Sequence, residues 1–296
     1  MATRHVEIER TLEIPLREVS GICTVRRTDG TAVLAAIGDA SSTLVWAKVS
    51  KQNGLGTWNH IDIADVAPGA LPREGTQAEA VAADAGGLLL LLLEEPARLL
   101  VFDIDARRLV VEIELTVPES QPIARAWADD PNSRGEGLIL LRDGRLLVIK
   151  EKHPAALMEF GPPGATEAKG LGRDQLLPLD EAWTPPAGPK ATFATLATWL
   201  LDDELADAVG DLSDAAVGFD GRLYLLSDQS STIVRPARIP PPGQGRVTAK
   251  EILRVRGKPE KAEALALLPG GRALVALDTK KPKKNLLLVG PRVAKS

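Results

Sequence analysis

The chain has 296 residues, of which 44% are apolar, 26% are charged and 3% are aromatic. This apolar share is typical of a folded globular protein and excludes a disordered or collagen-like chain. The 36 basic and 40 acidic residues leave a formal net charge of −4. Such a balance provides no strong positive field for nucleic acid or an anionic membrane surface, so we expect neither as a partner.

The first ten residues alternate charged and apolar side chains, which is not the pattern of a signal peptide. The longest uninterrupted apolar run, residues 88–93, is far shorter than the roughly 20 residues that span a bilayer. We therefore expect a cytoplasmic protein. One cysteine, Cys23, excludes an internal disulfide, and its apolar surroundings predict a small buried hydrophobe.

In chain order, the first expected element is an edge strand over residues 6–14, where apolar and polar side chains alternate. A pattern of three strands then recurs: an apolar strand, a tight turn, a second apolar strand ending in an acidic residue, and a third strand. The expected strands of the five copies are residues 20–25, 32–39 and 43–49; 78–84, 88–95 and 98–103; 124–129, 137–143 and 145–150; 213–218, 223–228 and 231–234; and 262–267, 273–278 and 285–289.

Asp-Gly and Gly-Gly pairs separate several of these strands, and such pairs favour hairpin turns because the turns need positive φ. A fourth strand is expected after some copies, over residues 58–63, 109–115 and 246–255. Repeated units of four antiparallel strands are typical of a β-propeller. The sequence thus predicts an all-β fold: a single propeller domain over residues 1–296 with five four-stranded blades, the last closed by the N-terminal strand.

A long gap separates the third copy from the fourth, and it contains a Pro- and Gly-rich stretch followed by a helix-like stretch over residues 195–209. Residues 161–210 are therefore interpreted as an insertion on the third blade or as a degenerate sixth blade. Both interpretations keep one closed domain.

Strand one of each blade should line the central channel, and the loop after strand two should open on the same face as the start of strand one. This geometry predicts two rings at the channel mouth. The inner ring comprises Ser20, Glu79, Arg125, Asp214 and Glu263, and the outer ring comprises Asp39, Glu94, Asp143, Asp228 and Asp278.

Converging carboxylates repel one another unless a cation compensates them. Oxygen ligands of this kind suit Ca²⁺ or Mg²⁺, for which the candidate ligands are Glu79, Asp214, Glu263 and Asp278. Arg125 can pair with a carboxylate instead, or bind an anionic ligand together with Ser20, Asp39 and Asp228. Aspartate is also a preferred turn residue, so the outer ring has a purely structural alternative explanation.

Residues 212–233 (LSDAAVGFDGRLYLLSDQSSTI) and 258–278 (KPEKAEALALLPGGRALVALD) resemble the SdiA-regulated and esterase-like phytase group of propellers. That group favours an acidic residue and then a small one at the start of strand one, and an Asp closing strand two. The resemblance covers about a fifth of the chain and implies a polar channel mouth with a bound divalent cation. The chain departs from the group in having Ala after the inner acids and in the interruption of the ring by Arg125.

Two functions remain open at this point. The first is a module that binds a protein or a small anionic ligand at the channel mouth, without catalysis. The second is a phytase-like hydrolase in which Glu79, Asp214 and Glu263 hold a cation that polarises a phosphoester or ester. A third interpretation assigns partner docking to the Pro-rich residues 161–190.

Overall fold

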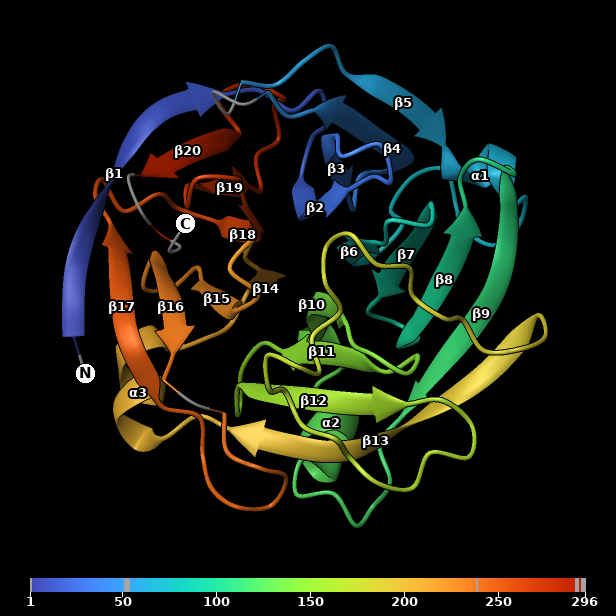
Figure 1. The fold of residues 1–296 in the computed structure, drawn as a ribbon, viewed down its shortest axis with the longest axis vertical. Coiled ribbons are helices and arrows are strands. Elements are labelled where there is room, and N and C mark those ends of the chain that lie inside the picture. The colour runs from blue at the N-terminus through green and yellow to red at the C-terminus, as the bar shows by residue number, and fades with distance from the viewer. Residues whose placement is uncertain (1, 51–53, 238, 291–292, 294–296) are drawn as a thin grey trace.

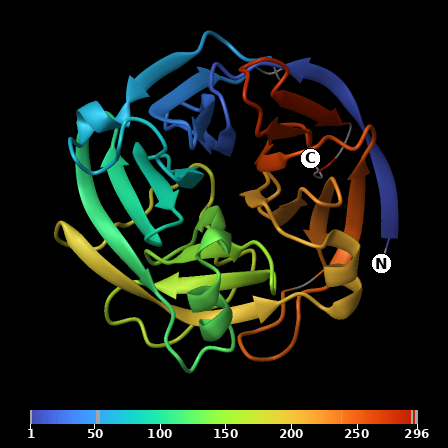
Figure 2. The same cartoon turned by 180° about the vertical axis from the view of Figure 1, so that it is seen from behind.

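The computed structural model describes residues 2–50, 54–237, 239–290 and 293, and nearly all of its regular structure is β-strand. The strands form antiparallel groups of four around a common centre, as Figures 1 and 2 show from opposite sides. None of the helices in these ranges has the length and apolar character needed to cross a bilayer.

We call the five groups strand sets 1 to 5, each written here from the innermost strand outward. Set 1 is β2 (Val19–Arg26), β3 (Ala32–Gly38), β4 (Ser41–Lys48) and β5 (Asn59–Asp62). Set 2 is β6 (Ala78–Ala83), β7 (Leu88–Leu93), β8 (Arg98–Asp103) and β9 (Arg108–Thr116). Set 3 is β10 (Arg134–Leu140), β11 (Leu146–Lys150), β12 (Ala156–Gly161) and β13 (Lys190–Leu200).

Set 4 is β14 (Asp214–Val217), β15 (Leu223–Ser227), β16 (Thr232–Pro236) and β17 (Ala249–Val255). Set 5 is β18 (Ala262–Leu267), β19 (Ala273–Leu277), β20 (Leu286–Gly290) and the N-terminal β1 (Ala2–Leu12). β1 pairs antiparallel with β20, so the N-terminal strand joins the last copy as expected. β1 also pairs parallel with β17, and β13 pairs parallel with β9, so the outer strands join neighbouring sets.

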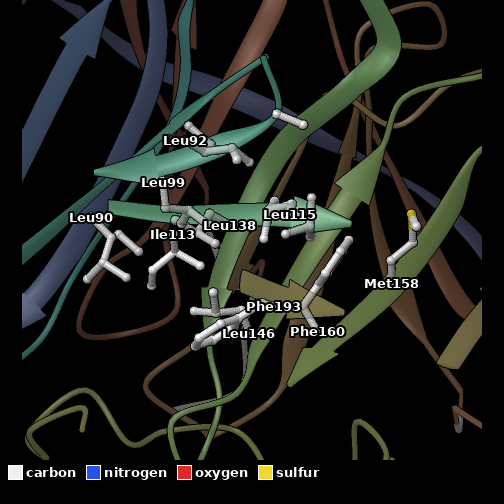
Figure 3. Close-up of a cluster of buried hydrophobic side chains, with 14 of the residues drawn as sticks. Leu90, Leu92, Leu99, Ile113, Leu115, Leu138, Leu146, Met158, Phe160 and Phe193 are labelled. Carbon is white, nitrogen blue, oxygen red and sulfur yellow. The ribbon is translucent and has the colours of Figure 1, made fainter. Parts of the chain in front are cut away.

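The innermost strands contact one another in a closed cycle, β2 to β6, β10, β14, β18 and back to β2. The apolar core accordingly consists of five clusters, each between two neighbouring sets. The run Leu88–Leu93 shows why: Leu90 and Leu92 pack against set 3, and Leu89, Leu91 and Leu93 pack against set 1. Successive side chains of a strand point to opposite faces, so a strand buried on both faces is apolar throughout. Figure 3 shows the cluster between sets 2 and 3.

The strand expected over residues 124–129 is wrong, because these residues form helix α2 (Ala124–Asp129), followed by a 3₁₀ turn (Pro131–Ser133). Three alanines give this stretch high helix propensity, and only Trp127 is buried, so a single apolar anchor suffices. Residues 134–140 form the inner strand of set 3, and the segment expected as strand three is strand two. The remaining helices are α1 (Ile63–Val66) and α3 (Asp203–Val209).

The long gap provides the outer strand of set 3. Between β12 and β13, residues 162–189 form no helix or strand beyond one bridge at Leu176. The expected helix over residues 195–209 is wrong in its first half, because β13 runs to Leu200 and only α3 is helical. From Phe193 onward β13 alternates buried and partly buried residues with a period of two, and the strand is rich in threonine, which favours a strand.

Candidate functional site: the acidic end of the ring

The inner strands begin with a β-bulge in sets 1, 2, 3 and 5, where pairing with strand two skips a residue. The skipped positions include Ser20, Glu79, Glu136 and Glu263. Bulges turn a side chain away from the pleated surface and are common beside functional sites. When the five sets are compared by the pairing of their inner strand with strand two, these four residues occupy equivalent positions. Ser213 occupies the same position in set 4.

The position after the bulge contacts the backbone of the neighbouring inner strand. A Cβ atom added to Gly21 would lie 2.9 Å from the Val81 nitrogen, and one on Gly137 would lie 2.9 Å from the Ala215 nitrogen. Glycine therefore avoids a backbone clash in sets 1 and 3. Asp214 occupies this position in set 4, and its carboxylate accepts the N–H groups of Ala215 at 2.7 Å and Leu265 at 2.6 Å.

The inner ring is thus Ser20, Glu79, Glu136, Ser213 and Glu263, and the structure corrects two of its expected members. Asp214 lies one residue away, bound to backbone, and burial holds its pKa well above the ordinary value. Arg125 lies on α2, where its side chain is 94% exposed and pairs with Asp129 at 3.3 Å. Arg125 was expected in the ring because residues 124–129 were expected to form the inner strand. The pattern Gly135-Glu136-Gly137 before an apolar run carried the signal for the correct residue.

The two serines link inner strands. The Ser20 hydroxyl donates to the carbonyl of Ala78 at 2.5 Å, and the Ser213 hydroxyl donates to the carbonyl of Ala262 at 2.8 Å. Each acceptor immediately precedes a ring glutamate, so these bonds fix the backbone that carries Glu79 and Glu263.

The residue after strand two is acidic in every set, which forms the outer ring. Its members are Asp39, Glu94, Glu151, Asp228 and Asp278. The expected member Asp143 is replaced by Glu151, because Asp143 lies in the β10–β11 turn at the other end of set 3, paired with Lys169. In four sets the outer-ring N–H donates to a carbonyl just before the inner strand, as from Glu94 to Gln77 at 3.2 Å and from Asp278 to Lys261 at 3.0 Å.

Some outer-ring carboxylates have partners. Asp228 accepts the N–H of Ala262 at 2.7 Å, Asp278 pairs with Lys261, and Glu151 pairs with Lys152 at 2.6 Å. For Asp228 and Asp278 a structural role is therefore evident. Within the part of the chain that the structure describes, Asp39 Oδ1 and Glu94 Oε1 are buried without a hydrogen-bond partner.

Burial is the main cause of raised pKa values among these acids, and mutual repulsion adds to it. The pKa of Glu79 rises to about 8, with contributions from Glu94, Asp39 and Glu263. The pKa values of Glu94 and Glu263 rise to about 7. Burial and the charges of Glu79 and Glu151 hold the pKa of Glu136 well above its ordinary value. These shared interactions place the acids at one end of the ring, which we call the acidic mouth.

The candidate metal ligands Glu79, Asp214, Glu263 and Asp278 do not form a coordination site. Asp214 is bound to backbone and Asp278 to Lys261. Among the described residues, no three His, Cys, Asp or Glu side chains lie close enough together to hold one ion. These four side chains therefore do not by themselves provide a shared set of oxygen ligands for one Ca²⁺ or Mg²⁺ ion.

The other end of the channel is closed by the segment between β12 and β13. Leu177, Pro178 and Leu179 line a channel cavity of only about 50 Å³ together with the inner strands. Leu177 donates its N–H to the carbonyl of Leu140 at 3.1 Å, and Arg26 donates to that of Leu179 at 3.0 Å. We call residues 177–179 the plug, and part of the Pro-rich segment expected to dock a partner therefore packs inside the molecule.

Cys23 lies half-buried in the wall of this narrow channel. Burial and the charge of Asp214 raise its pKa to about 12. We expect the native thiol to react with a disulfide reagent at pH 8 about a thousandfold more slowly than in 6 M guanidinium, because the thiolate is the nucleophile. Equal rates in the two conditions would contradict this environment.

The comparisons with known proteins are structural ones. The Myxococcus xanthus glutaminyl cyclase structure has a TM-score of 0.51 and 14% identity, covering 98% of this chain and 97% of that one. The regucalcin of Agrobacterium tumefaciens, described as a calcium-binding protein, has a TM-score of 0.52 and 12% identity, covering 98% and 95%. No family model matches the chain. No curated protein matches it in sequence.

These likenesses and the ring of strand sets define a β-propeller-like protein. At such identities they show the fold alone. They support the propeller expected from the sequence, but not the SdiA-regulated and esterase-like phytase group in particular.

Proposed function

We propose that the chain is a five-bladed β-propeller, one blade for each strand set, that acts as a binding module for a small organic polycation at its acidic mouth. The observation that carries the proposal is the pair of buried, unpartnered carboxylate oxygens on Asp39 and Glu94. A buried acceptor without a donor is costly, and a ligand that donates hydrogen bonds removes that cost.

The sign of the ligand follows from the composition of the mouth. Three glutamates of the inner ring and five acids of the outer ring converge there, and Lys152 and Lys261 each pair with one of them. The small anionic ligand expected earlier depended on Arg125, which lies on α2. A cation replaces the protons that the raised pKa values keep on Glu79, Glu94 and Glu263.

The shape of the ligand follows from the spread of the acids. Among the described residues no three His, Cys, Asp or Glu side chains are placed to hold one ion, so several ammonium groups on a chain match the ring better than one metal ion. The alternative function, a metal-assisted hydrolase, needs a cation site, and no three described His, Cys, Asp or Glu side chains are placed to hold one ion. The calcium-binding description of regucalcin and the phytase resemblance make Ca²⁺ and Mg²⁺ necessary comparison ligands.

Calorimetric titration with spermidine tests the proposal. We expect binding that is about tenfold tighter at pH 8 than at pH 6, because the ligand displaces protons. Glu79→Gln/Glu263→Gln should weaken it by about tenfold or more, since two charge-assisted contacts are lost.

The matched control is Glu119→Gln/Glu167→Gln, which removes two exposed carboxylates outside the mouth. If both variants weakened spermidine binding equally, the overall charge of the protein would explain the loss. This result would contradict the proposal. Binding of Ca²⁺ or Mg²⁺ at the mouth without spermidine binding would replace it with the metal-dependent alternative.

A further inference from the structure

A second cavity lies between sets 3 and 4, away from the acidic mouth. Its volume is about 470 Å³. Residues 169–173 of the segment after β12 form one wall, and residues 221–223, from the β14–β15 turn into β15, form another. The end of β16 with the prolines 240–242, and Lys250 on β17, complete it (orange in Figure 1). The β14–β15 turn places it at the plugged end of the ring.

The lining of this cavity is strongly basic. Within the described residues it contains no Asp or Glu, and its cationic members are Lys169, Arg173, Arg222, Arg235 and Lys250. The chain as a whole has a net charge of −4, so this concentration runs against the overall balance. The lining of this cavity therefore has the opposite charge to the acidic mouth.

Arg235 is the buried cation of the lining. Its side chain is only 10% exposed, and one terminal nitrogen donates to Glu251 at 2.8 Å. Its Nε is buried and has no hydrogen-bond partner among the described residues. A guanidinium has donors in a fixed planar fork that matches carboxylate and phosphate oxygens, so a second acceptor is required.

Two more cations of the lining, Arg173 and Lys250, are available to a ligand. The other two, Lys169 and Arg222, already pair with Asp143 and Asp220, which lie outside the lining. Arg173 packs over Gly221, where an added Cβ would lie 2.8 Å from its Nε. In residues 2–50, 54–237, 239–290 and 293, neither Arg173 nor Lys250 has an ion-pair partner.

We propose that this cavity binds a small molecule bearing two or more oxyanion groups, carboxylate or phosphate. The oxyanions lie against the exposed cations Arg173 and Lys250, which approach from two segments, and the buried guanidinium of Arg235 adds positive charge to the lining. Charge-assisted hydrogen bonds to several fixed cations give such a ligand both affinity and orientation.

Titration calorimetry with inorganic pyrophosphate and with citrate tests the site and distinguishes the two oxyanion chemistries. We expect at least one probe to bind, and Arg173→Gln/Lys250→Gln to weaken it by about tenfold or more. Both residues are exposed, so this variant should fold. Binding of pyrophosphate alone assigns a phosphate ligand, and binding of citrate alone assigns a polycarboxylate.

The control variant is Lys280→Gln/Lys281→Gln, which removes two exposed cations from the β19–β20 loop. It should bind like the wild type. Absence of binding by both probes, or an equal loss in the two variants, would overturn the proposal. Neither result depends on spermidine binding, so the test is independent of the acidic mouth.

Discussion

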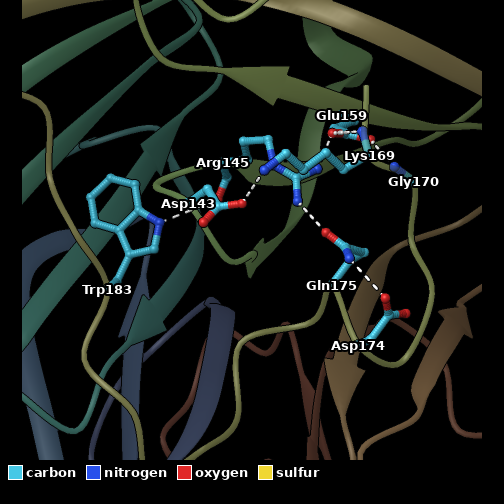
Figure 4. Close-up of polar contacts among 8 residues, drawn as sticks. All are labelled: Asp143, Arg145, Glu159, Lys169, Gly170, Asp174, Gln175 and Trp183. Carbon is cyan, nitrogen blue, oxygen red and sulfur yellow. Dashed lines mark hydrogen bonds and ion pairs between the residues drawn. The ribbon is translucent and has the colours of Figure 1, made fainter. Parts of the chain in front are cut away.

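Replacing Arg145 with methionine is expected to lower the free energy of unfolding by about 3–5 kcal/mol, because it leaves a buried carboxylate without its cation. Arg145, which directly precedes β11, and Glu159 on β12 are 2% and 0% exposed and form an ion pair. Arg145 also donates to Gln175 at 2.7 Å, and Glu159 accepts the N–H groups of Lys169 and Gly170 at 2.9 Å (Figure 4). The pair thus anchors the segment that carries the plug.

Urea denaturation provides the measurement, with Arg142→Met as the matched control. The Arg142–Glu181 pair at 2.7 Å is nearly half exposed, so its loss should cost about 1 kcal/mol or less. Adding Glu159→Gln to Arg145→Met should recover part of the loss, because the buried charge is removed while the glutamine carbonyl oxygen still accepts one of the two N–H groups. A cost for Arg145→Met no greater than that of the control would show that the buried pair does not anchor the segment.

Without ligand, the protein should become less stable as the pH rises from about 5 to about 8. The pKa of Glu79 is about 8 and those of Glu94 and Glu263 are about 7, against 4.5 in the unfolded chain. Between these values the folded state holds protons that the unfolded state has released. Stability is therefore fully present below the unfolded pKa and is lost as the pH rises through the folded pKa.

Thermal unfolding at a series of pH values tests this expectation. Glu79→Gln/Glu263→Gln should match the wild type near pH 5 and exceed its Tm by about 2 °C or more at pH 8, since a stability gain of 1 kcal/mol shifts Tm by about that much. Glu119→Gln/Glu167→Gln should follow the wild-type curve, because both side chains are exposed. Parallel curves for wild type and mouth variant would show that these glutamates do not titrate as the structure indicates.

Set 3 differs most from the strands that the sequence predicts. Residues 124–129 alternate small and large side chains, as the inner strands do, but alanine also favours a helix, and six residues are too few to decide by pattern. Because the first two strands of set 3 were expected too early in the chain, Arg125 and Asp143 were expected in the rings. The correct members, Glu136 and Glu151, follow the same rules as the other copies and were recognisable from Gly135-Glu136-Gly137 and from the end of the apolar run 146–150.

The position of Asp214 could not be predicted in the same way. Its neighbours in sequence resemble those of Glu263. The inner strand of set 5 has a bulge at Glu263, however, whereas the inner strand of set 4 pairs without a bulge at Asp214. A bulge depends on how two strands pair, and its one-residue shift changes which side chain faces the channel.

The sequence by itself determined the β-strand character, the hairpin turns, the attachment of β1 to β20 and most of the acidic ends of strand two, because these depend on local periodicity and turn chemistry. Only the tertiary structure decided the closed cycle of inner strands, the plug at Leu177–Leu179, the Arg145–Glu159 pair and the basic cavity around Arg235. These features join residues distant in the chain. Their partners are selected by packing and by the need to satisfy buried charge, which no local pattern records.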